Sequence, residues 1–155
     1  TNEVKELGKQ YLKTIKSAHD DIGGDLQHVG NKDIVEFYKT RLYNIGSFME
    51  NLQFNDELHA TRKQIKTLMY NRKLAQNALD GKLLISNDYL DKLQTLIGDW
   101  HDNVLALELF SSAGFNSKPV ITKIKSQNTR LKRSITTLAH DFERKAILTQ
   151  QLSMH

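Results

Sequence analysis

The sequence predicts an all-α protein, an antiparallel helical bundle of four to five helices that ends in a long C-terminal helix. Three observations predict this class. Apolar residues recur at helical spacing along almost the whole chain, strand signals are scarce, and capping and turn residues divide the chain into segments of helical length. With 155 residues, 39% of them apolar and 26% charged, the chain is expected to form one domain over residues 1–155.

The first two predicted helices are separated by a polar connection that contains glycines. The first covers residues 4–22, where apolar residues fall on one face, and Gly23-Gly24 ends it. The second can be capped by Asn31 or Asp33. Its apolar stripe contains Ile34, Phe37, Tyr38, Leu42, Ile45, Phe48, Met49 and Leu52. Arg41 lies inside this stripe.

The other three helices are limited by N-cap residues, turn pairs and a proline. The predicted limits are Asn55 or Asp56 to about Ala78, Ser86 or Asn87 to Ala113-Gly114, and Pro119 to about Gln151. Proline suits a first turn because its missing N–H would have no partner within the helix there. The inner face of the fourth helix is expected to contain Tyr89, Leu90, Leu93, Leu96, Ile97, Trp100, Val104 and Leu107.

Two segments contain Lys and Arg without any Asp or Glu, although the net charge is only +4. Residues 58–79 hold five basic residues, and residues 109–140 hold six. A helical projection of the third helix places a basic stripe beside its apolar face, made of His59, Arg62, Lys63, Lys66, Tyr70 and Lys73. The last helix carries a second basic stripe with Lys123, Arg130 and Arg133.

The chemistry of these stripes favours a polyanion as ligand. Basic side chains repeated at each helical turn, about 5.4 Å apart, suit a ligand with repeated negative charge. Arg binds phosphate oxygens through a planar fork, whereas Lys acts as a point charge. We therefore predict that the two stripes lie side by side and form one positive trough. A solvated basic face without a ligand is the competing interpretation.

The sequence around these residues resembles the CHAD family, the conserved histidine α-helical domain. The resemblance rests on Leu58-His59, Arg62-Lys63, Lys66, Leu68 and Tyr70, followed by LQTLIGDWHDNVLALELF with Leu96, Gly98, His101, Asp102 and Val104. It covers residues 58–110. The family implies helical bundles whose His, Arg and Lys side chains bind inorganic polyphosphate, generally without catalysis. The anion contacts that it implies are those of His59, Arg62, Lys63 and Lys66, and the orienting residues are His101 and Asp102.

The chain departs from the family pattern in two ways. Met69 stands where another Arg is usual, so the anion contact that this Arg would make is not expected here. A full family member has two similar bundles, whereas this chain is long enough for about one. Residues 35–48 resemble a worn copy of the motif helix, with Arg41 at a basic position but no His at its head. A homodimer would supply the second bundle; a shortened chain or a single-bundle family member would explain the length equally well.

Three other functions fit parts of the sequence less well. A histidine phosphotransfer module is also a helical bundle, but Arg62 and Lys63 crowd the turn after His59. A carboxylate-bridged metal site needs paired Glu-x-x-His motifs, and only Asp56 with His59 has that spacing. Nucleic acid is also bound through phosphates, but only Tyr70 offers a stacking surface on the stripe. No cofactor, nucleophile or phosphate-loop motif indicates an enzyme.

The composition bears on the cellular location. The chain has no Cys, which excludes disulfides and thiolate metal sites. No apolar run approaches the roughly 18 residues that a membrane span requires. The N-terminus shows no signal peptide, although it also lacks an initiator Met. These features favour the cytoplasm and no contact with a membrane, without fixing the compartment.

Overall fold

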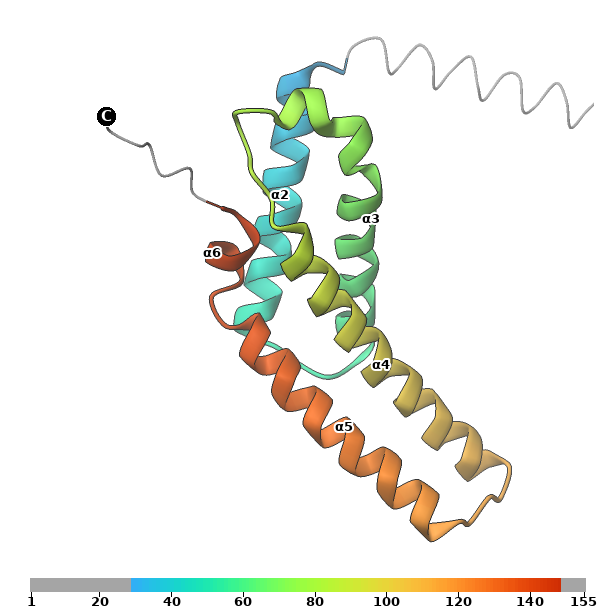
Figure 1. The fold of residues 1–155 in the computed structure, drawn as a ribbon. Helices are drawn as coiled ribbons and strands as arrows, with labels where there is room; N and C mark the ends of the chain where they lie inside the picture. Colours follow the sequence, from blue (N-terminus) through green and yellow to red (C-terminus); the bar gives the residue numbers. More distant parts are fainter. Residues whose placement is uncertain (1–28, 149–155) are drawn as a thin grey trace, which may run out of the picture.

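The computed structural model describes residues 29–148, which form helices joined by short connections (Figure 1). In chain order these are α2 (Asn31–Glu50), α3 (Asp56–Leu79), α4 (Asn87–Ser112), α5 (Lys118–Ala139) and the short α6 (Phe142–Ala146). Successive long helices pack as antiparallel neighbours, and no strand occurs within residues 29–148. The predicted all-α antiparallel bundle is therefore confirmed. The predicted first helix, residues 4–22, lies outside the described residues.

The core lies where the apolar stripes of the four long helices meet. Its most completely buried side chains include Leu42, Leu58, Ile65, Leu90, Leu93, Ile97 and Ile135. Burying each of them stabilises the fold by about 1.5–3 kcal/mol relative to an exposed side chain. Two tyrosines link neighbouring helices: Tyr38 Oη donates to the Leu68 carbonyl oxygen at 2.9 Å, and Tyr89 Oη donates to that of Leu138 at 2.7 Å. These hydrogen bonds fix how α2 aligns with α3 and how α4 aligns with α5.

The buried face of α2 differs from the predicted stripe at two positions. Phe37, expected in the core, is 43% exposed, whereas Val35 is 7% exposed. The reason is the position of α2 between α3 on one side and α6 on the other. The contact with α6 buries Gly46, where the Glu143 side chain approaches, and Val35 lies on the buried face of the same helix. Phe37 is left at the edge of the interface.

The starts of α2 and α3 show two ways of satisfying free backbone N–H groups. Asn55 caps α3, as predicted: its Oδ1 accepts from the N–H groups of Glu57 at 3.1 Å and Leu58 at 3.4 Å. At α2 the cap residue is Gly30, and Asp33 Oδ2 accepts from the Gly30 N–H at 2.8 Å. Asp33 therefore supports the start of α2 from inside the helix and is not itself the cap.

The last long helix ends earlier than predicted. It was expected to continue to about Gln151, but α5 ends at Ala139. Asp141 has φ 56°, a left-handed conformation that no continuous α-helix contains. The turn directs α6 back onto α2 and α4, where Phe142 and Ala146 are buried.

The segment after α6 is joined to the connection between α3 and α4. An isolated antiparallel bridge pairs Ile85 with Ile147. The Ser86 N–H donates to the Ala146 carbonyl and the Leu148 N–H to the Leu84 carbonyl, both at 2.9 Å. These bonds place residues 147 and 148 against the loop that leads into α4.

The far halves of α4 and α5 extend beyond α2 and α3 as a two-helix arm, residues 104–125 (Figure 1). Within it, α4 has no buried residue after Trp100, and α5 has none before Asn128. Val104 and Leu107, expected on the inner face of α4, are only half-buried. Apolar exposure is high because no third helix among residues 29–148 covers the pair: Leu105 is 48% exposed and Leu109 63%.

Candidate anion-binding surface

The α3 stripe (His59, Arg62, Lys63, Lys66, Tyr70 and Lys73) lies on the side of α3 away from most of its buried residues. Lys63 and Lys73 are exposed, and the Lys66 Nζ lies over the Tyr70 ring, 5.4 Å from its centroid. Within the described residues, the only ion pairs join Asp141 to His140 and Arg144. No described carboxylate therefore forms an ion pair with the stripe.

Arg62 connects the α3 stripe to α4. Its Nε donates to the Gln94 carbonyl oxygen at 3.0 Å. Gly98 makes this approach possible, because a Cβ there would lie 2.9 Å from the Arg62 Nε and Nη2 atoms. The guanidinium remains partly exposed and keeps other N–H groups for an anion. The sequence indicates the charge of Arg62 but not its bond to the backbone of α4.

His59 and His101 form a stacked pair across the α3–α4 interface. Their ring centroids are 3.8 Å apart and their planes differ by 20°. His59 Nδ1 is buried and has no hydrogen-bond partner among the described residues. Burial lowers the pKa of His59, and the neighbouring His101, Lys63 and Arg62 lower it further, against an opposing effect of Asp56. The neutral ring is thus favoured until a negative charge approaches.

The remaining predicted site residues on α2 and α4 are less closely connected to the stripe. Asp102 is exposed and forms no ion pair or hydrogen bond with a described residue, so the structure gives no contact for its expected orienting role. Arg41 is exposed on α2, and its guanidinium lies over the Phe37 ring at 5.4 Å from the centroid. Both residues of that contact belong to α2, so it does not connect Arg41 to the α3 stripe.

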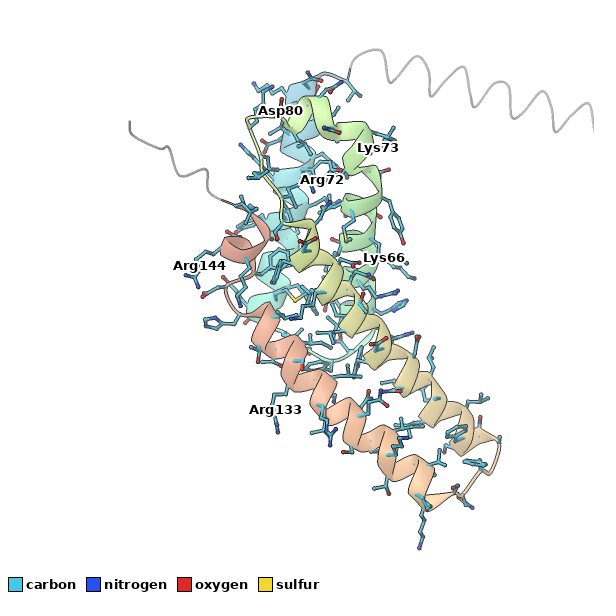
Figure 2. The ribbon with its side chains drawn as sticks, viewed as in Figure 1. Lys66, Arg72, Lys73, Asp80, Arg133 and Arg144 are labelled. Carbon is cyan, nitrogen blue, oxygen red and sulfur yellow. The ribbon has the colours of Figure 1, made fainter. Side chains whose placement is uncertain are left out.

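The predicted single trough is wrong, because the α3 stripe and the α5 stripe (Lys123, Arg130 and Arg133) do not lie side by side. α3 packs mainly against α2 and α4, whereas the main neighbour of α5 is α4. Each stripe is also turned away from the buried side chains of its own helix, and thus from the core. Figure 2 shows Lys66 and Arg133 at opposite edges of the molecule. Within residues 29–148 the two stripes are thus separate basic surfaces.

Comparison with known protein families identifies the segment that carries the α3 stripe. Residues 38–111 match the model of the CHAD domain. This segment is a CHAD domain. It takes in most of α2 and all of α3, together with α4 as far as Ser111, so the His59–His101 pair and Arg62 lie inside the CHAD domain and the α5 stripe lies outside it. No curated protein and no solved structure gives a significant match to the chain.

The geometry of the CHAD domain bears on the competing chemistries. One ring nitrogen of His59, Nδ1, is buried, and one face of the ring is stacked on His101, so neither is open to a phosphoryl donor. Among residues 29–148, no three His, Asp or Glu side chains gather closely enough to hold a metal ion. None of the described helices combines the length and the apolar character needed to cross a membrane.

Proposed function

We propose that the chain binds inorganic polyphosphate, or a similar polyanion, along the α3 stripe of its CHAD domain without catalysing a reaction. One observation carries the proposal: the stripe repeats positive side chains along one face of α3, and no described carboxylate neutralises them. Successive cations about one helical turn apart suit a chain of phosphates. His59, Arg62, Lys63 and Lys66 make the contacts, and Tyr70 and Lys73 extend the surface.

The α5 stripe provides a second basic surface in this proposal. Lys123, Arg130 and Arg133 are exposed, but they cannot contact the same short segment of polyanion as α3. A long polyphosphate could contact both surfaces, whereas a short one would occupy only one. Affinity should therefore rise with phosphate chain length beyond the length that covers α3.

Titration with two polyanions tests the proposed ligand class. Polyphosphate and single-stranded DNA of equal charge are added separately near physiological salt, and the titrations are repeated at several salt concentrations. We expect tighter binding of polyphosphate, because the described stripe offers cations but only Tyr70 for stacking. Affinity should fall steeply with salt, since each neutralised phosphate releases about one condensed ion in the analogous case of DNA. A preference for DNA would make nucleic acid the ligand.

Charge reversal tests the proposed surface. Lys63→Glu with Lys66→Glu removes two contacts and adds repulsion. Each charge-assisted contact is worth about 1.5 kcal/mol or more, so at least a tenfold loss of affinity is expected. Lys32→Glu with Lys39→Glu is the matched control, because both lysines are exposed on α2. If the two pairs of substitutions weakened polyphosphate binding equally, binding would depend on general surface charge and not on the α3 stripe.

We also propose that two copies of the chain associate. The arm supports this, because Leu105 and Leu109 are exposed to water in the single chain. Sedimentation velocity measures the mass directly. A dimer that Leu105→Ser with Leu109→Ser dissociates would agree with the proposal. A monomer at all concentrations would exclude it and leave the α3 surface unaffected.

A further inference from the structure

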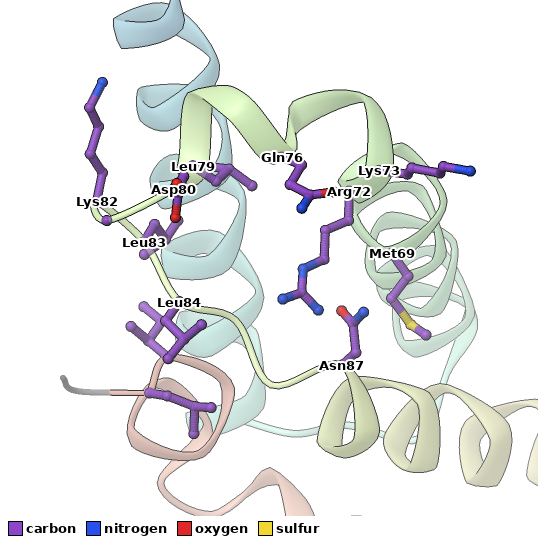
Figure 3. A pocket seen from close by; sticks show the side chains of 13 residues that line it. Met69, Arg72, Lys73, Gln76, Leu79, Asp80, Lys82, Leu83, Leu84 and Asn87 are labelled. Atoms are coloured by element: carbon purple, nitrogen blue, oxygen red, sulfur yellow. The ribbon is translucent and has the colours of Figure 1, made fainter.

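A cavity of about 700 Å³ lies beyond the end of the α3 stripe, where Lys73 borders it, between the C-terminal half of α3, the connection to α4 and residues 147–148 (Figure 3). One part of its wall is apolar and includes Leu79, Leu83, Leu84 and Ile147. Polar side chains come from Arg72, Gln76 and Asn87. The cavity therefore combines an apolar wall with a few polar groups, which is typical of a small-molecule site.

Arg72 supplies the positive charge directed into this cavity; Lys73 and Lys82 also line it, but Figure 3 shows their side chains pointing away. The Arg72 side chain is half-buried, and Figure 3 shows its guanidinium directed toward Asn87 at the start of α4. The guanidinium forms no hydrogen bond or ion pair with any described residue. None of its five N–H donors is therefore engaged by a residue that the structure describes.

Asn87 supplies an independent indication of a ligand. Its Oδ1 atom is buried and has no hydrogen-bond partner in the part of the chain that the structure describes. A buried polar atom without a partner is costly, at about 1–3 kcal/mol, and a ligand with a donor group would remove that cost. The Arg72 guanidinium and the Asn87 side chain amide, neither of them paired with a described residue through these atoms, thus face the same space.

We propose that this cavity binds a small organic anion with an apolar body. Its carboxylate or phosphate monoester lies against Arg72, a hydroxyl or N–H group donates to Asn87 Oδ1, and its apolar part lies on the leucines. Asp80 also lines the cavity and disfavours a ligand with many negative charges. The site is thus distinct in chemistry from the polyanion surface, and it does not depend on polyphosphate binding.

Five probes on the full chain separate the parts of this proposal: 3-hydroxyoctanoate, octanoate, octyl phosphate, octanol and inorganic phosphate. Isothermal titration calorimetry should show saturable one-site binding of the three amphipathic anions, with 3-hydroxyoctanoate tighter than octanoate. Whichever of octanoate and octyl phosphate binds more tightly shows whether the site prefers a carboxylate or a phosphate monoester. Octanol and inorganic phosphate should bind at least about tenfold more weakly, because each lacks one of the two interactions. Equal binding of octanol, or no saturable binding of any anion, would overturn the proposal.

Two variants locate the binding in the cavity. Arg72→Gln should weaken octanoate at least about tenfold, whereas Lys73→Gln, whose side chain points away, should not. Leu84→Ser should weaken octanoate without affecting folding, since Leu84 is already 42% exposed. If Arg72→Gln does not fold, the octanoate affinity of Leu84→Ser alone tests whether octanoate binds in the cavity. Unchanged octanoate affinity in Leu84→Ser would then contradict the site, and Lys63→Glu with Lys66→Glu should leave octanoate binding intact.

Discussion

His59 is a side chain of the CHAD domain whose charge state depends on its surroundings. Burial and nearby positive charges lower its pKa below the ordinary 6.5. The unfolded chain then takes up the proton more readily than the folded chain. The stabilising contribution of the neutral ring is complete above about pH 6.5 and is lost as the pH falls toward the folded-state pKa.

A bound polyanion should reverse this preference, because phosphate charge near His59 favours the protonated ring. We predict that polyphosphate affinity rises as the pH falls from about 7.5 to 5.5, and that His59→Gln flattens this rise. Titrations at several pH values measure the effect. His140→Gln is the control, since His140 is exposed beyond the end of α5. A profile that His59→Gln leaves unchanged would exclude His59 from binding.

Arg62 should contribute to stability as well as to binding. Arg62→Lys keeps the positive charge but removes the Nε donor to the Gln94 carbonyl oxygen. We predict a decrease in the free energy of unfolding of about 1 kcal/mol. Urea denaturation measures it. Lys66→Arg is the control on the same face, because Lys66 makes no hydrogen bond to the described backbone, and the two variants should differ clearly.

Among the helices, the start of α3 illustrates how a local signal determines structure. Asn55→Ala removes the side chain that accepts from two backbone N–H groups, so we predict a loss of about 1 kcal/mol in the free energy of unfolding. Ser117→Ala is the matched control, since Ser117 precedes α5 but makes no side-chain capping bond. Urea denaturation of both variants tests this. If Asn55→Ala and Ser117→Ala lowered the free energy of unfolding equally, the Asn55 cap would have no specific stabilising role.

The existence and faces of individual helices could be predicted because they depend on residues close together in the chain. Asn55, the Asp80-Gly81 turn and the Ala113-Gly114 pair each mark a helix limit locally. The end of α5 could not be predicted in this way. The apolar pattern continues through Phe142, and the left-handed turn at Asp141 accompanies the packing of α6 on α2 and α4.

The arrangement of the helices decides which parts of the candidate site meet. Projection placed the basic residues of α3 and of α5 correctly on exposed faces, but it carries no information on which helices are neighbours. The packing of α4 between them separates the stripes. The His59–His101 stack and the Arg62–Gln94 bond depend on the same packing of α3 on α4, so sequence spacing alone could not establish them.

The arm should be the least protected part of α4 and α5. Amide hydrogen exchange should be faster for residues 104–125 than for residues 90–100, because the bundle part of α4 contributes buried Leu90, Leu93 and Ile97. Mass spectrometry of exchanged peptides measures this. Addition of polyphosphate should slow exchange along α3 more than in the arm. Equal protection along the whole of α4 in a monomer would contradict the prediction.

The pairing of Ile85 with Ile147 has a consequence for how the chain acquires its shape during synthesis. The ribosome delivers α2, α3 and α4 well before residues 146–148, so the loop before α4 must wait for its backbone partners. Until then Ala146 and Phe142 leave uncovered the surface of α2 that they later bury. A nascent chain stalled before residue 140 would therefore expose apolar side chains that the finished chain hides.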